Sequence, residues 1–131
     1  MTHRVPFYET DAMGVVHHSN FVRYLEEARV AWLDDYDQPY SAYVEQGFHF
    51  ATTRVEVDYR QSVRFDERVE VAVWAEWVRG ASLRLAYTLH VGDRLVATAA
   101  TEHAAVDPTG AVRRIPKERR ESLRAQVATG E

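Results

Sequence analysis

Cysteine is absent from this chain of 131 residues, so the protein has no disulfide, no thiolate metal ligand and no cysteine nucleophile. Proline and glycine are scarce, at four and six residues, which excludes a collagen-like or low-complexity chain. No apolar run approaches the ~20 residues that a membrane-spanning helix needs, and the first residues lack the apolar core of a signal peptide. We therefore expect a cytoplasmic protein with a single domain over residues 1–131.

Positive charge is also limited. Residues 1–107 carry 10 basic and 17 acidic side chains, residues 108–131 carry six basic and three acidic ones, and the net charge is −4. Duplex nucleic acids are bound largely through phosphate neutralisation, so we expect no nucleic-acid partner. The basic C-terminal segment fits a solvated tail, the exposed face of a terminal helix, or a contact with a localised phosphate cluster.

Apolar residues first follow a helical spacing. After a cap at Ser19 or Asn20, this spacing predicts a helix that ends near residues 34–38, before Pro39. A second, short helix is predicted over residues 40–46, closed by Gly47. The apolar stripe of the long helix consists of Phe21, Tyr24, Leu25, Ala28 and Trp32.

The spacing then changes to the alternation of strands. It predicts a short first strand over residues 3–8, broken by Pro6, and long strands over residues 54–60, 69–77, 83–91 and 94–106. Turns at residues 80–81 and 92–93 indicate antiparallel hairpins and an α+β fold. One helix covers little of so long a sheet, and Trp74 lies among the outward positions, so we expect the sheet to meet a second subunit.

Residues 9–19 carry the chemistry. Asp11 lies in a non-periodic segment that turns at Gly14 and leads into a helix N-terminus at residues 18–20. Unpaired N–H groups at a helix start stabilise a developing oxyanion. A nearby carboxylate acts as a nucleophile or as a general base on water. Together these groups suit acyl transfer to water, although a loop aspartate before a helix is also a common turn or cap residue.

The same segment resembles the signature of hotdog-fold acyl-CoA thioesterases of the 4-hydroxybenzoyl-CoA thioesterase and YbgC-like type. This resemblance implies a long central helix wrapped by a five-stranded antiparallel sheet. It also implies a homodimer or homotetramer with active sites between subunits. The matching residues are Tyr8, Thr10, Asp11, Gly14, Val16, His18, Asn20, Phe21, Tyr24, Glu26, Ala28 and Arg29.

The resemblance also implies roles for individual residues. Asp11 is the catalytic carboxylate, and the backbone N–H of His18 is the oxyanion donor, with the adjacent His17 as the alternative pocket histidine. Arg79, at a turn between two strands, is the first candidate for the CoA phosphates, followed by Arg113, Arg114 and Lys117. The remaining substrate-binding and loop-shaping candidates are Tyr8, Gly14, Val16, Asn20 and Tyr24.

The predicted reaction is the hydrolysis of an acyl-CoA to a free acid and CoA, with no cofactor and no metal. Glu26 and Glu27, on the predicted helix, are alternative catalytic carboxylates. Two other functions stay open: a dehydratase or hydratase of the same fold, and a non-catalytic binder of acyl-CoA or acyl-carrier protein. An acyl-carrier protein is also a possible thioester donor, since its acidic surface complements the basic residues.

Overall fold

The computed structural model describes residues 1–127 and contains one five-stranded sheet with the strand order β1-β3-β4-β5-β2. Every neighbouring pair of strands is antiparallel. The strands are β1 (Thr2–Arg4), β2 (His49–Tyr59), β3 (Arg68–Val78), β4 (Ser82–Val91) and β5 (Arg94–Val106). The helices are α1 (Ser19–Tyr36), α2 (Tyr40–Glu45) and α3 (Lys117–Arg124), with a 3-10 turn η1 at Phe7–Glu9.

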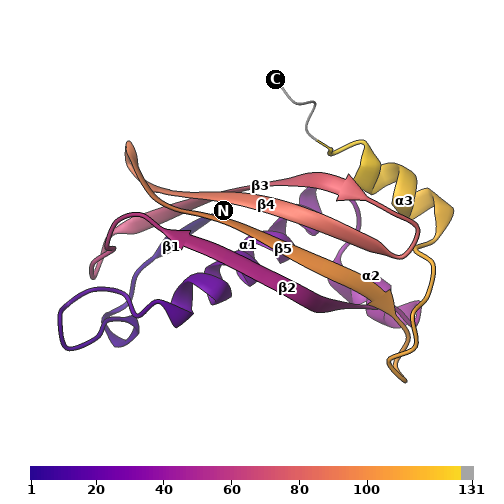
Figure 1. Cartoon of the computed structure of the whole chain (residues 1–131), viewed down its shortest axis with the longest axis horizontal. Coiled ribbons are helices and arrows are strands. Elements are labelled where there is room, and N and C mark those ends of the chain that lie inside the picture. The colour runs from indigo at the N-terminus through magenta and orange to yellow at the C-terminus, as the bar shows by residue number, and fades with distance from the viewer. Residues whose placement is uncertain (128–131) are drawn as a thin grey trace.

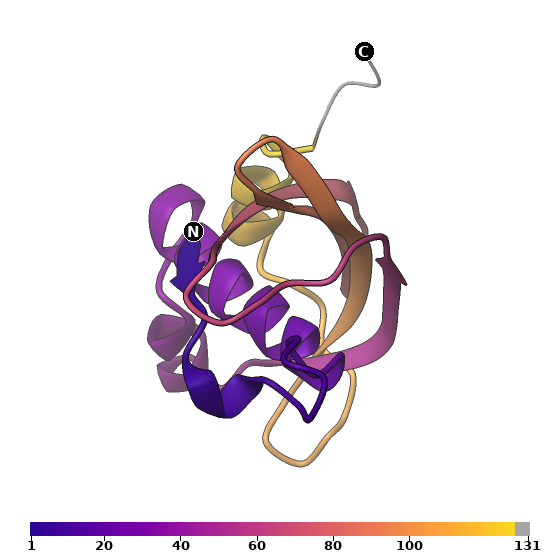
Figure 2. The ribbon, with the colours of Figure 1, turned by 90° about the vertical axis from the view of Figure 1, so that its left-hand side faces the viewer.

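Helix α1 lies in the hollow of the curled sheet (Figures 1 and 2). Its predicted apolar stripe is buried, and Tyr24 and Leu25 have no exposed surface. Full burial of one such side chain contributes roughly 1.5–3 kcal/mol, so this stripe holds the helix against the sheet. The predicted hotdog fold, a long helix wrapped by a five-stranded antiparallel sheet, is confirmed.

The long strands and both hairpins are confirmed, with β2 five residues longer at its start than the alternation predicted. The N-terminal strand differs from its prediction over residues 3–8. It ends at Arg4, and the chain turns into η1 after Pro6, which has no N–H to donate to a neighbouring strand. The predicted side-chain cap of α1 is also wrong. His18 occupies the cap position, makes no side-chain cap bond, and already has helical dihedral angles.

The basic C-terminal segment forms α3, which packs on β3 (Figure 1). Leu123 is fully buried there, and Arg124 donates from Nε to the carbonyl oxygen of Val78. Residues 117–124 are therefore a terminal helix and not a solvated tail, whereas a contact of this segment with phosphate groups stays a prediction. No helix within residues 1–127 is long and apolar enough to cross a membrane.

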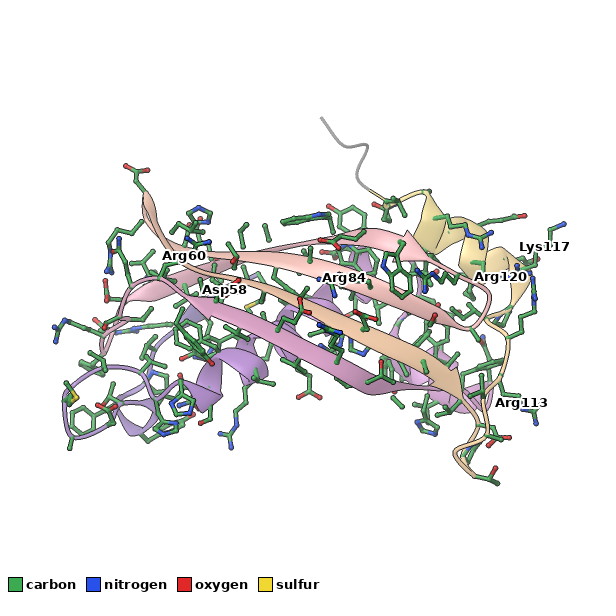
Figure 3. The ribbon with its side chains drawn as sticks, viewed as in Figure 1. Asp58, Arg60, Arg84, Arg113, Lys117 and Arg120 are labelled. Atoms are coloured by element: carbon green, nitrogen blue, oxygen red, sulfur yellow. The ribbon has the colours of Figure 1, made fainter. Side chains whose placement is uncertain are left out.

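The outer face of the sheet carries a compact charge cluster around Arg84, at the middle of the sheet in Figure 3. Its guanidinium group donates to Glu56, Glu76 and Glu102 at 2.7–2.9 Å. These three carboxylates raise the pKa of Arg84. The cluster joins β2, β3, β4 and β5 on the face opposite α1.

Candidate functional site

Asp11 lies in a tight turn between η1 and α1. Its N–H donates to the carbonyl oxygen of Val15 at 2.9 Å, and its own carbonyl accepts from the N–H of Gly14 at 2.9 Å. Gly14 has φ +77°, in the left-handed region that favours glycine. The Asp11 carboxylate is exposed, and its Oδ1 accepts from the N–H of Met13 at 2.9 Å. One carboxylate oxygen of Asp11 is therefore bound within the turn, and the other is available to a ligand.

The turn is joined to the helix by a short extended segment. Val16 is buried, and its N–H donates to the carbonyl oxygen of Val63 at 2.7 Å. His18 follows as the last residue before α1. Within residues 1–127 the N–H of His18 donates no hydrogen bond, so it is a free donor at the positive end of the helix dipole.

Asp11 and His18 line the same open groove, which has a volume of about 390 Å³. The hydroxyl group of Tyr59, at the end of β2, donates to the carbonyl oxygen of His18 at 3.0 Å. Partial burial raises the pKa of Tyr59. The positively charged Arg60 also lines the groove. In Figure 3 it lies at the same end of the molecule as Asp58. The other lining residues are Val15, Val16, Phe21, Gln61, Ser62 and Val63.

Tyr59 and Arg60 were missed by the sequence analysis. They follow His18 by 41 and 42 residues, and they meet it only because β2 runs back along α1. The local signal was weak, since an alternating strand that ends in Tyr-Arg is an ordinary surface pattern.

Asn20 and Tyr24 lie behind the groove. Asn20 is buried and donates from Nδ2 to the carbonyl oxygen of Glu9 at 3.1 Å. Tyr24 is fully buried, and its hydroxyl donates to Glu9 Oε1 at 2.6 Å. Burial, followed by the Glu9 carboxylate, raises the pKa of Tyr24. Glu9, which the sequence analysis did not select, is therefore a buried acid directly behind the Asp11 turn.

The two adjacent histidines differ in their placement. His18 lines the groove, whereas His17 places Nδ1 2.8 Å from Ser19 Oγ. Their rings pack in a tilted arrangement, with centroids 4.2 Å apart. Tyr8 is 82% exposed on the turn η1 and is not among the groove residues. The structure thus brings Asp11, Val16 and His18 together around the groove, with Gly14 in the turn beside them.

Arg79 lies at the other end of the sheet from Asp11. Val15, beside Asp11, pairs with Arg64 in the segment that leads into β3, whereas Arg79 follows the end of β3. A strand of this length spans roughly 35 Å. The guanidinium group of Arg79 lies 3.9 Å from the ring centroid of Trp77. Arg113 and Lys117 share this basic end of the molecule in Figure 3.

A separate cavity of about 180 Å³ lies between the second half of α1 and the sheet. Its walls are mostly apolar, and Phe50 and Thr52 of β2 contribute to it. His103 also lines it, fully buried, with Nδ1 3.2 Å from Thr52 Oγ1 and Nε2 2.8 Å from Thr101 Oγ1. Burial, reinforced by the charge of Arg29, lowers the pKa of His103 to about 3, so this imidazole is neutral.

Comparisons with known proteins agree with this architecture. A family model described as the thioesterase-like superfamily matches residues 5–127. A crystal structure of a hypothetical protein from Aquifex aeolicus is 36% identical, covers 94% of this chain and 97% of its own, and has a TM-score of 0.89. A crystal structure of a hypothetical protein from Thermus thermophilus is 30% identical, and the match covers 98% of this chain and 97% of that chain. Its TM-score is 0.92. Acyl-CoA thioester hydrolase YbgC from Escherichia coli is 31% identical over 80 residues, which are 61% of this chain and 60% of that protein.

Proposed function

We propose that this chain, which belongs to the thioesterase-like superfamily and is a thioester hydrolase, cleaves acyl-CoA thioesters to a free acid and CoA. One observation carries the proposal: an exposed carboxylate, Asp11, and a free helix N-terminal donor, the N–H of His18, line the same groove. These are the two groups that hydrolysis of an activated acyl group needs.

In the proposed reaction the thioester carbonyl oxygen accepts a hydrogen bond from the His18 N–H. Charge that develops on this oxygen in the transition state is stabilised by the donor and by the helix dipole. Asp11 acts in one of two ways. It attacks the carbonyl carbon, releasing CoA thiolate and leaving an anhydride that water hydrolyses, or it takes a proton from the water that attacks. Both routes start from the ionised carboxylate and need no strong general acid, because a thiolate is a good leaving group.

The proposed assembly is a homodimer that pairs two copies of β2. This strand is an edge of the sheet, and edge strands expose unpaired backbone groups. Val22 of α1 and Val55 of β2 line a surface groove beside this edge, and both are exposed apolar residues. Exposed apolar surface next to a free sheet edge is typical of an interface.

Antiparallel pairing of β2 with its copy would place the Tyr59 end of one protomer beside the His49 end of its partner. Arg113 lies at the His49 end, because its N–H donates to Ala105, which pairs with Phe50. The basic end of one subunit, which includes Arg79, would then face the Asp11 groove of the other. We therefore assign the CoA phosphates to Arg60 of the same subunit together with the Arg79 end of the partner subunit.

The test is thiol release from short-chain, long-chain and aromatic acyl-CoAs by the wild-type protein. The chain contains no cysteine, so a thiol reagent detects only released CoA. We expect turnover of at least one class. Binding of acyl-CoA without any thiol release from the whole panel would contradict the proposal.

A further inference from the structure

Glu9 is a buried acid whose carboxylate accepts two side-chain hydrogen bonds. Its side chain is 7% exposed, and it precedes Asp11 by two residues. A single carboxylate oxygen, Oε1, accepts from the hydroxyl of Tyr24 at 2.6 Å and from Nε2 of His3 at 2.9 Å. A buried carboxylate is strongly unfavourable unless such donors compensate for its lost hydration. The hydrogen bonds therefore fix where this side chain lies.

The backbone of Glu9 is held as well. Its carbonyl oxygen accepts from Asn20 Nδ2 at 3.1 Å and from the N–H of His17 at 2.9 Å. Two donors to the side chain and two to the carbonyl therefore converge on this one residue, from β1, from α1 and from the segment before α1.

Asp11, by contrast, forms its hydrogen bonds to residues 1–127 only within its own turn, with Met13, Gly14 and Val15. Its carboxylate is exposed. Thr10, between Glu9 and Asp11, bonds back to the carbonyl oxygen of Phe7 through its N–H and its hydroxyl. Glu9 is thus the nearest residue before Asp11 that is tied to α1, the helix whose start supplies the His18 N–H.

We propose that Glu9 is a positioning residue, which holds the Asp11 turn at a fixed distance from the His18 N–H. Tyr24 and His3 act through Glu9. The inference rests on the proposed function, because the group that Glu9 positions is Asp11. A displacement of a reacting group by about 1 Å costs up to about a hundredfold in rate, so the position of this turn matters for the chemical step.

His3 completes the arrangement from the N-terminal strand. Its ring lies against that of Tyr24, with centroids 4.4 Å apart, and its Nδ1 lies 3.3 Å from Glu27 Oε2. Glu27 is largely exposed. The His3 imidazole therefore lies between two acids, Glu9 and Glu27, of which only Glu9 is buried. Strand β1 supports the Asp11 turn through this imidazole.

The variants Glu9→Gln, Glu9→Ala and Tyr24→Phe test the proposal, with Glu102→Ala as the matched control. Glu102 is a half-buried carboxylate that also accepts a charge-assisted hydrogen bond, from Arg84 at 2.7 Å, but it lies on the outer face of the sheet. The measurements are kcat and KM on an acyl-CoA, and amide hydrogen exchange of the peptide 9–18. Thermal unfolding monitors the global fold.

We expect Glu9→Ala to lower kcat between about tenfold and a hundredfold, with little change in KM, because the turn loses its support while the groove keeps its lining. Hydrogen exchange of residues 9–18 should rise in the same variant. Glu9→Gln should retain most of kcat, since its amide oxygen still accepts from Tyr24. Glu102→Ala should change neither kcat nor the exchange of this peptide.

A double-variant measurement separates positioning from general destabilisation. Glu9→Ala should lower the residual rate of Asp11→Asn far less than it lowers the wild-type rate, because the group that it positions is already disabled. An equal loss in both backgrounds, or an unchanged kcat in the wild-type background, would overturn the proposal. If Glu9→Ala does not fold, Tyr24→Phe decides by the same two criteria.

The same experiment distinguishes a failure of the proposed catalytic role of Asp11 from a failure of the proposed positioning role of Glu9. Wild-type turnover by Asp11→Asn would refute the proposed catalytic role of Asp11, and with it the positioning of that residue. Loss of turnover in Asp11→Asn together with an unaffected Glu9→Ala would refute the positioning role alone.

Discussion

The hydroxyl of Tyr59 and the carbonyl oxygen of His18 are joined by a 3.0 Å hydrogen bond. This bond connects the edge strand β2 to the peptide at which α1 begins, although the two residues are 41 positions apart. Tyr59 also packs edge-on against Phe21, with ring centroids 5.1 Å apart. Strand β2 therefore fixes one wall of the groove and the orientation of the helix start in it.

Removal of this bond by Tyr59→Phe should lower kcat by about fivefold, because one hydrogen bond is worth about 1 kcal/mol. Without this bond the His18 peptide, whose N–H is the oxyanion donor, is held less firmly. This weakens stabilisation of the transition state and not substrate binding, so KM should change little. Steady-state kinetics on an acyl-CoA measure the effect. Tyr36→Phe, at another exposed tyrosine, is the control. Equal kinetics for wild type and Tyr59→Phe would show that β2 does not hold the oxyanion donor.

The assignment of the CoA phosphates predicts that Arg79→Met and Arg60→Met each raise KM for acyl-CoA. Each substitution would remove a charge-assisted contact with a CoA phosphate worth about 1.5–3 kcal/mol, so KM should rise about tenfold or more. The same acyl group on pantetheine, which lacks the phosphates, is the control substrate, and its KM should not change. A parallel rise for both substrates would mean that these arginines support the fold instead.

The assembly through β2 predicts that Val55→Arg yields a monomer. A charged side chain at this exposed apolar position opposes burial in an interface. Sedimentation at micromolar concentration should give a dimer or larger for the wild-type protein and for Val44→Arg. Val44 has nearly the same exposure, at 43% against 42% for Val55, but lies on α2. A monomeric wild-type protein with full activity would refute the assembly.

The buried imidazole of His103 predicts a pH dependence of stability. Its pKa is about 3 in the folded protein and near 6.5 in the unfolded chain, so the unfolded chain binds more protons between these values. Stability should therefore fall as the pH decreases from 6.5 toward 3, by up to about 1.4 kcal/mol per pH unit from this group.

Chemical unfolding of the wild type and of His103→Gln across this pH range measures the contribution of that imidazole. The difference between the two free energies of unfolding should shrink as the pH decreases. His90→Gln, at a half-buried histidine of β4, is the control. A difference that stays constant from pH 6.5 to pH 3 would contradict the buried, neutral state of His103.

The fold was predictable because its signals are local. Two-residue alternation marked the long strands, and the stripe from Phe21 to Trp32 marked the face of α1 that the sheet covers. The errors also have local causes. Pro6 ended the first strand earlier than predicted, and Asn20 turned its side chain back to Glu9 instead of capping the helix.

Only the N-terminal part of the candidate site was predictable from the sequence. Asp11, Gly14 and His18 lie close together in the sequence, so their spacing shows that they share one turn and one helix start. Tyr59 and Arg60 come from β2, and only the path of the chain brings them to the groove. Arg79 was correctly placed on a turn, but its position at the far end of β3 depends on the topology of the sheet.

The most direct test of the account is the turnover of Asp11→Asn. The asparagine oxygen still accepts from the N–H of Met13, so the turn is preserved while the negative charge is removed. Thiol release from the best acyl-CoA should fall by at least about a hundredfold, as expected for the loss of a nucleophile or general base. Wild-type turnover by a folded Asp11→Asn protein would show that Asp11 is a turn residue and that the chemistry lies elsewhere.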